Sequence, residues 1–164
     1  MEDMRLAWAR LEGRSGHETA YQLLAQMYRE ETGEDCPQIA KTPRGKPYFT
    51  ESALHFSISH TKSHAFCVLA PYNVGIDAEE MNRKINLRLA EKILSPAEKL
   101  RYESAQDPCA ALLRLWVLKE AAAKLTGEGL QGYPNHTDFR PEDKRILEID
   151  GCYVAVLKEI DDAV

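Results

Sequence analysis

A chain of 164 residues is long enough for one well-buried domain or for two small halves packed against each other, and too short for three large domains. A formal net charge of -5, with charged and apolar residues both plentiful, is typical of a soluble protein and argues against nucleic-acid binding over the whole surface. The opening has no long apolar core of a signal peptide, no run is long enough to span a bilayer, and the four cysteines form no CxxC pair. We therefore expect a cytoplasmic protein with no membrane and no nucleic-acid partner.

The first half of the chain combines strand and helix patterns. Residues 4–11 are expected to form a strand, and apolar residues at helical spacing over 18–31 predict an amphipathic helix. Proline and glycine are expected to break any regular element over 41–49. Two strands are expected next, at 54–59 and 64–71, because both segments are apolar and rich in strand-forming residues.

Helix signals dominate the second half. Residues 87–94 have a helical pattern, and a serine, a proline and a glutamate at the start of 95–102 predict a capping box. An Asp-Pro pair then starts the longest expected helix, at 109–125, which a glycine should end. A hairpin of strands at 146–149 and 152–160, joined by an Asp-Gly turn, completes an α+β pattern.

Two carboxylates stand two residues apart in the segment GIDAEE. If this segment is a strand, Asp77 and Glu79 point to one face, while Ile76 and Ala78 point to the other. Like charges held together cost free energy unless a proton or a cation offsets them. The pair therefore titrates unusually, lies in open water, or binds a metal, and taken alone a solvated strand end is the more ordinary interpretation.

Three further motifs have both an ordinary and a functional interpretation. Trp116, Glu120 and Lys124 recur every four residues on one face of the long helix, where a surface acid–base pair beside a core tryptophan is the ordinary case. His60 ends a strand, where a structural histidine is more common than a ligand. The loop RGKP, residues 44–47, presents two cations that could approach a phosphate, although such loops usually keep their charges solvated.

The motifs follow one another in the order GKP, FSISHT, GIDAEEM, LSPAEK and WVLKEAAAK. This succession resembles the 4′-phosphopantetheinyl transferase superfamily, whose signatures are a GKP loop, an S-H-(S/T) strand end, a GID-x-E strand and a W-x-x-K-E-x-x-x-K helix. The resemblance covers roughly residues 45–124, about half of the chain. It implies an α+β fold of two pseudo-twofold-related halves, 1–73 and 74–164, each with a helix packed on a small antiparallel sheet and together forming one compact unit.

The resemblance also implies roles for individual residues. Asp77, Glu79 and Glu120 are expected to bind Mg²⁺, which takes oxygen ligands and completes its shell from phosphates and water. Glu120 and Lys124 are expected to be catalytic. Coenzyme A is expected to be held by residues from the loop, the strand end and the long helix, namely Arg44, Lys46, Pro47, Ser59, His60 and Lys124.

The implied reaction transfers the phosphopantetheine arm of coenzyme A, the co-substrate, to a serine of an acyl or peptidyl carrier protein and leaves adenosine 3′,5′-bisphosphate. Mg²⁺ is expected to orient the pyrophosphate and Lys124 to stabilise the departing bisphosphate, while either Glu120 or a metal-bound water accepts the serine proton. Two other functions stay open at this point. One is a coenzyme A-binding regulatory module without turnover, and the other is an unrelated Mg-dependent phosphohydrolase.

The chain departs from the family pattern in its basic residues. The cation cluster that often binds the 3′-phosphate is thin, which leaves Arg14 and His17 as substitutes. No GID-like motif opens the chain, so a monomer of two shortened halves is expected instead of the trimer of short family members. A candidate docking surface for an acidic carrier, with a solvated helix face as the alternative, consists of Arg83, Lys84, Arg88 and Lys92.

Overall fold

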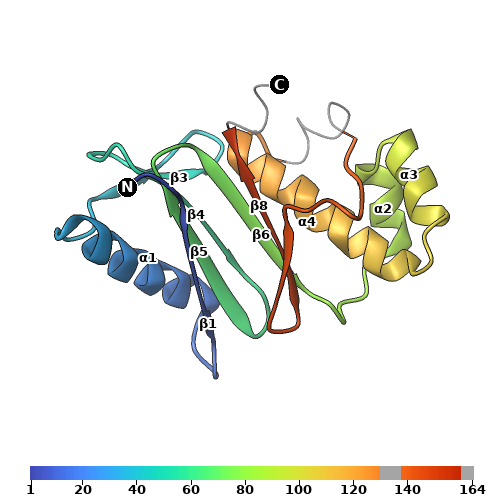
Figure 1. The fold of residues 1–164 in the computed structure, drawn as a ribbon, viewed down its shortest axis with the longest axis horizontal. Coiled ribbons are helices and arrows are strands. Elements are labelled where there is room, and N and C mark those ends of the chain that lie inside the picture. The colour runs from blue at the N-terminus through green and yellow to red at the C-terminus, as the bar shows by residue number, and fades with distance from the viewer. Residues whose placement is uncertain (130–137, 160–164) are drawn as a thin grey trace.

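Two three-stranded antiparallel sheets and two long helices make up most of the protein (Figure 1). The computed structural model describes residues 1–129 and 138–159. The described strands are β1 Arg5–Arg10, β2 Ile39–Lys41, β3 Pro47–Phe49, β4 His55–His60, β5 His64–Ala70, β6 Val74–Glu80, β7 Ile146–Ile149 and β8 Cys152–Lys158. The described helices are α1 Gly16–Thr32, α2 Leu87–Ile93, α3 Pro96–Glu103 and α4 Pro108–Thr126. The expected α+β class is confirmed.

The two large sheets have the same topology. In the first sheet β1 pairs with β5 and β5 with β4, all antiparallel. In the second sheet β6 pairs with β8 and β8 with β7, again antiparallel. Each sheet is therefore built from a strand, a helical segment and a hairpin whose last strand lies in the centre. The strands of the first sheet all precede residue 73, and those of the second all follow it.

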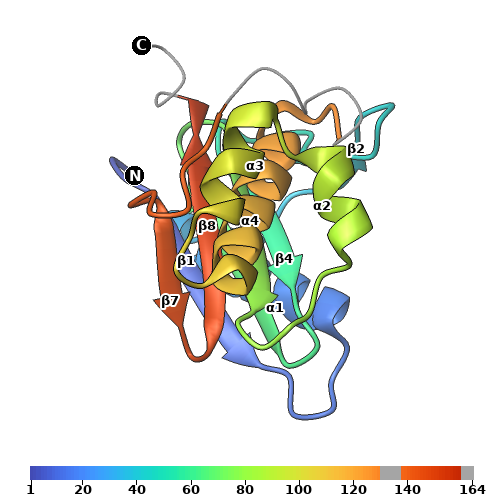
Figure 2. The ribbon, with the colours of Figure 1, turned by 90° about the vertical axis from the view of Figure 1, so that its right-hand side faces the viewer.

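The two sheets share an apolar core, and each also carries a helix (Figure 1). Phe66 of β5, Ile76 of β6 and Val154 of β8 are buried in the cluster that joins the sheets. Helix α1 packs on the first sheet, where its Leu24 meets Leu69 of β5 in a separate cluster. Helix α4 packs on the second sheet, and α2 and α3 lie on its outer side (Figure 2). The site described below lies where α4 contacts β4 and β6.

The sequence of α4 sets both of its ends. The Asp107 side chain accepts a hydrogen bond from the Ala110 N–H (3.2 Å), and Pro108 occupies the first turn. Gly127 ends the helix with a φ of 74°, and its N–H donates to the Ala123 carbonyl (2.9 Å). Most side chains of α4 are buried, which fixes its register on the sheet. No helix of the described residues has both the length and the apolar character needed to cross a membrane.

The expectation that residues 41–49 contain no regular element is wrong. Ala40 of β2 pairs with Tyr48 of β3, and the Gly45 N–H donates to the Thr42 carbonyl (2.8 Å) in the connecting turn. Gly45 has a φ of 94°, which an L side chain rarely adopts. Proline and glycine therefore shape the turn of a hairpin here instead of ending regular structure.

Candidate active site

Side chains of β6 alternate between two faces. Ile76 and Ala78 are buried in the core between the sheets, whereas Asp77 and Glu79 point toward α4. Asp77 is only 7% exposed, and Glu79 is half-buried. The expectation that the two carboxylates share a face is confirmed.

One face of α4 meets these carboxylates. The Lys124 ammonium donates to Asp77 Oδ1 (3.0 Å), and the Trp116 indole donates to Glu79. Glu120 lies between them on the same helix face, near enough for the charges on Asp77 and Glu79 to act on it. The four-residue spacing in the sequence therefore corresponds to a stripe of α4 that faces β6.

Burial raises the pKa of all three carboxyls. Desolvation is the main reason that the pKa of Glu120 is raised to about 7, and repulsion from the Asp77 carboxylate is the second. Burial also raises the pKa values of Asp77 and Glu79, although Lys124 opposes the shift at Asp77 and Arg83 opposes it at Glu79. Three carboxyls thus gather around two cationic side chains, and ionising all three is costly without a further cation.

One buried oxygen atom indicates where a cation fits. Asp77 Oδ1 accepts hydrogen bonds from Lys124 (3.0 Å) and Ser59 (3.3 Å), but its Oδ2 is buried and has no hydrogen-bond partner among the described residues. Such an atom costs free energy unless something pairs with it. Carboxylate oxygens are the ligands that Mg²⁺ prefers, so Asp77, Glu79 and Glu120 form a donor set that suits this ion.

Two serines of β4 attach the first half to β6. The Ser57 hydroxyl accepts the Ile76 N–H (3.1 Å), and the Ser59 hydroxyl accepts the Ala78 N–H (3.1 Å) while donating to Asp77. Both serines are buried. Ser59, which was expected to contact coenzyme A, therefore contacts the β6 backbone and holds the Asp77 carboxylate in place.

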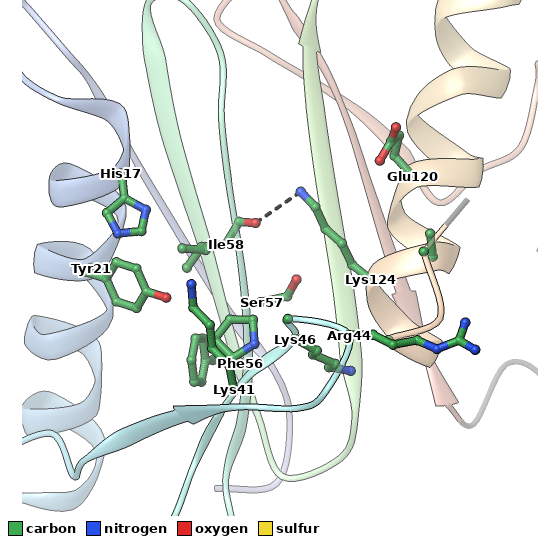
Figure 3. A pocket seen from close by; sticks show the side chains of 15 residues that line it. His17, Tyr21, Lys41, Arg44, Lys46, Phe56, Ser57, Ile58, Glu120 and Lys124 are labelled. Carbon is green, nitrogen blue, oxygen red and sulfur yellow. Dashed lines mark hydrogen bonds between the residues drawn. The ribbon is translucent and has the colours of Figure 1, made fainter. Parts of the chain in front are cut away.

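A cavity of about 350 Å³ opens beside the carboxylates, between α1 and α4 (Figure 3). We call it the interhelix cavity. Tyr21 and Lys41 line it on one side, and Glu120 and Lys124 line it on the other. Elements that precede residue 73 and elements that follow it therefore both contribute to its walls.

The GKP loop borders the same cavity. Arg44, Lys46 and Pro47 all line it. The Lys46 ammonium donates to Asn73 Oδ1 (2.7 Å) and the Leu125 carbonyl (2.8 Å), and burial lowers the pKa of this lysine. Arg44 donates to the carbonyl of residue 128 (3.0 Å). Both side chains thereby tie the loop to the C-terminal end of α4.

His60 lies in a different place from the GKP loop. It is exposed at the end of β4 and lines a second hollow of about 570 Å³ together with Glu79, Glu80 and Arg83. We call this the β4–β6 hollow. His60 is thus next to the carboxylates but is not part of the interhelix cavity.

The sequence analysis did not identify Lys41 or Tyr21 as site residues. Lys41 ends β2 and is exposed, so only the unexpected hairpin brings it to the interhelix cavity. The helical spacing on α1 does place Tyr21 one turn from His17, which also lines the cavity. Arg14 instead donates to the carbonyls of Leu11 and residue 10, which fixes it at the end of β1.

These features define an α+β protein in which elements from both sides of residue 73 line a cavity with a carboxylate cluster at one end. The model of the 4′-phosphopantetheinyl transferase superfamily matches residues 73–153, which include β6 and α4. A 4′-phosphopantetheinyl transferase, psf-1 of Bacillus pumilus, is 31% identical over 130 residues, covering 77% of this chain and 52% of the relative. The chain belongs to the 4′-phosphopantetheinyl transferase superfamily.

Two further relatives match shorter segments. The 4′-phosphopantetheinyl transferase gsp of Aneurinibacillus migulanus is 30% identical over 92 residues, covering 55% of this chain and 38% of the relative. A holo-acyl-carrier-protein synthase of Yersinia pestis is 36% identical over 69 residues, covering 38% of this chain and 55% of the relative. The chain spans about half the length of the curated relatives it matches.

Proposed function

We propose that the protein transfers the 4′-phosphopantetheine arm of coenzyme A to a serine hydroxyl of an acyl or peptidyl carrier protein and releases adenosine 3′,5′-bisphosphate. The observation that carries this proposal is the convergence of Asp77, Glu79, Glu120 and Lys124 at one end of a cavity that both halves line. The activities for which the relatives are named support the same reaction class.

Asp77, Glu79 and Glu120 would hold Mg²⁺. The buried, unpartnered Asp77 Oδ2 and the raised pKa of Glu120 both support a cation at this point. The ion would supply charge neutralisation and orientation of the pyrophosphate. Ser59 fixes the Asp77 carboxylate, so that one ligand is positioned before substrate binds.

Lys124 and Glu120 would have separate chemical roles, charge stabilisation for Lys124 and proton acceptance for Glu120. Lys124 holds its ammonium between Asp77 Oδ1 and the Ile58 carbonyl at the cavity wall, where it would stabilise charge on the departing bisphosphate. Glu120 lines the same cavity, and a carboxylate with a pKa near 7 is suited to accept the serine proton at neutral pH.

The interhelix cavity would receive the nucleotide end of coenzyme A. Lys46 and Arg44 shape it by anchoring the loop, and Pro47 lines the wall. Lys41 also lines the cavity, and its ammonium makes no hydrogen bond or ion pair with any of the described residues. We assign Lys41 to a phosphate group of coenzyme A, with His17 as its neighbour on α1.

The carrier protein would dock beside α2. Arg88 and Lys92 of α2, together with Lys84 and Arg83 before it, are exposed, and Arg83 also contacts Glu79 of the carboxylate cluster. A positive surface next to the reacting groups would attract an acidic carrier. His60 would face the phosphates or the carrier from the β4–β6 hollow.

The two halves, 1–73 and 74–164, would be related by a pseudo-twofold axis within a single monomer. The proposal is supported by the strand order that the two sheets share, in which the last strand of the hairpin lies between the first strand and the other hairpin strand. The joined core between the sheets supports one compact unit.

Mass spectrometry of an apo carrier protein, after incubation with this protein, coenzyme A and Mg²⁺, tests the proposed transfer. We expect one phosphopantetheine group on one serine and the release of adenosine 3′,5′-bisphosphate. If the protein instead bound coenzyme A but left carriers of both fatty-acid and peptide synthesis unmodified, it would be a binding module. Phosphate release without a carrier would indicate a phosphohydrolase.

Replacing Lys41 by alanine is expected to raise the KM for coenzyme A by about 3- to 30-fold, with little change in kcat, because a phosphate contact made equally in ground and transition state is lost. Lys144→Ala, an exposed lysine outside both hollows, is the matched control. Repeating the assay with dephospho-coenzyme A identifies the phosphate: the effect should disappear if Lys41 binds the 3′-phosphate. An unchanged KM for coenzyme A would remove Lys41 from the site.

A further inference from the structure

A second cluster of potential metal ligands lies at the end of β6, on the face opposite Glu79. Its members are His64, the first residue of β5, Glu80, the last residue of β6, and Cys152, the first residue of β8. One donor atom from each residue lies within 4.8 Å of the other two. His64 and Cys152 are buried, and Glu80 is half-buried. None of the three is used by the proposed transfer reaction.

The distance between two of these donors matches zinc coordination. Cys152 Sγ lies 3.6 Å from His64 Nδ1. With Zn–S near 2.3 Å and Zn–N near 2.0–2.1 Å, tetrahedral ligands lie about 3.5 Å apart. An ion could therefore bridge the thiol and the imidazole without a movement of β5 relative to β8.

The far side of the imidazole is already oriented for metal binding. His64 Nε2 lies 2.7 Å from Asp150 Oδ2, and Arg10 donates to both oxygens of Asp150 (2.7 and 2.9 Å). A carboxylate that accepts the Nε2 proton leaves the Nδ1 lone pair free to face the cluster. This carboxylate–histidine arrangement is the usual second layer of a zinc site.

The near side of the imidazole faces a hydroxyl and a carboxylate. The Ser63 hydroxyl lies 2.7 Å from His64 Nδ1 and also contacts Glu80 Oε1. Glu80 Oε1 accepts further hydrogen bonds from Thr61 Oγ1 (3.0 Å) and the Ser63 N–H (3.1 Å). A hydroxyl has one proton and can donate to only one of two acceptors. A metal ion on Nδ1 would leave Glu80 as the one acceptor of the Ser63 hydroxyl proton.

We propose that His64, Glu80 and Cys152 bind Zn²⁺. A thiolate and an imidazole select zinc over Mg²⁺, which prefers oxygen ligands. The β4–β6 hollow, which Thr61 and Glu80 line, gives the ion and a fourth ligand from solvent a route of entry. Because β5 belongs to the first sheet and β6 and β8 to the second, the ion joins the two halves at the end remote from the GKP loop.

A nucleophilic role does not suit Cys152. Burial is the main reason that the pKa of its thiol is raised to about 11, and the negative charge of Glu80 is the second. The metal-free thiol is therefore neutral at physiological pH. The residue is fully buried, which also keeps substrates away. Cys152 packs in the core between the sheets, and its position between an imidazole and a carboxylate also suits a metal ligand.

Co²⁺ is the probe for this site, since a thiolate ligand gives it a charge-transfer band in the near ultraviolet. The chelator-treated full chain, in excess Mg²⁺ to occupy oxygen-only sites, is titrated with Co²⁺ and then with Zn²⁺. We expect one equivalent of Co²⁺ with the thiolate band, displaced by one equivalent of Zn²⁺, and a rise in Tm with Zn²⁺.

Variants assign the band to the cluster. Cys152→Ala should lose the thiolate band, and His64→Gln should weaken Co²⁺ binding at least tenfold, whereas Cys109→Ala and His55→Gln, at exposed positions, should leave both unchanged. Asp150→Asn should weaken binding about 10- to 100-fold. Asp150 has a φ of 47°, which asparagine tolerates, so the last variant should fold.

Three results would overturn the proposal. These are the absence of a thiolate band at micromolar Co²⁺, a band that survives in Cys152→Ala, and a band that Cys109→Ala also removes. The first would mean that Cys152 only packs in the core between the sheets.

Discussion

Glutamine in place of Glu120 is expected to lower the rate of phosphopantetheine transfer by about 10²- to 10⁴-fold. The substitution keeps the size of the side chain and the helix, but it removes a charge from the proposed magnesium ligands and the proposed base. Glu120 lines the interhelix cavity beside Lys124 and interacts with the charges on Asp77 and Glu79. Initial rates of holo-carrier formation, followed by mass spectrometry, measure the effect.

Thermal unfolding of the same variant separates a site effect from a folding effect. The parent should gain Tm on addition of Mg²⁺ and coenzyme A by ligand linkage, and Glu120→Gln should gain much less. Glu103→Gln, an exposed glutamate at the end of α3, is the matched control and should behave as the parent. Transfer by Glu120→Gln at the parent rate would show that the metal assignment on α4 is wrong.

The pH dependence of stability without Mg²⁺ gives an independent check. The pKa of Glu120 is about 7 in the folded protein, against 4.5 for a glutamate in water. Between these two pH values the folded protein therefore binds more protons than the unfolded chain does. The stability of the parent therefore falls as pH rises from about 4.5 to about 7. Glu120→Gln lacks this loss and should be more stable than the parent above pH 7 by about 1–2 kcal/mol, allowing for partial solvent exposure.

Features that depend on neighbouring residues could be predicted from the sequence. The capping box that starts α3 and the aspartate and glycine that bound α4 all occur where the pattern places them. The alternation of β6 placed Asp77 and Glu79 on one face, and helical spacing placed Glu120 and Lys124 together on another. Each of these follows from a period of two or 3.6 residues, which local geometry fixes.

Features that depend on distant pairing could not be predicted in this way. Lys41 reaches the cavity only because β2 and β3 form a hairpin, and the turn residues alone do not distinguish a hairpin from a loop. Likewise, the hydroxyl of Ser59 bonds to β6, eighteen or more residues further along the chain, instead of facing the cavity. The family pattern identifies such residues but does not state which partner each side chain contacts.

The role of Gly75 also depends on such a distant contact. A Cβ atom built at this position would lie 2.1 Å from the Ala121 carbonyl oxygen and 2.6 Å from the Leu125 nitrogen. Both are backbone atoms of α4 or its end, so no side-chain rotation can relieve the overlap. The glycine of the GID motif therefore allows α4 to approach β6 closely enough for Lys124 to reach Asp77 (3.0 Å).

Gly75→Ala is accordingly expected to lower the free energy of unfolding by about 3 kcal/mol or more, since an added methyl group must displace a whole helix. Transfer activity should fall by at least tenfold at a temperature where the variant is still folded, because Glu120 and Lys124 move with α4 while Asp77 stays on β6. Urea unfolding followed by circular dichroism gives the first quantity and mass spectrometry the second.

Gly45→Ala provides the comparison for Gly75→Ala. A Cβ atom there meets nothing within 4 Å, so only the positive φ opposes the substitution, at a cost of about 1–2 kcal/mol. We therefore expect Gly75→Ala to be clearly the less stable of the two variants. If Gly75→Ala were as stable as Gly45→Ala, α4 would not lie against β6 at this distance, and the placement of Glu120 and Lys124 beside Asp77 would have to be abandoned.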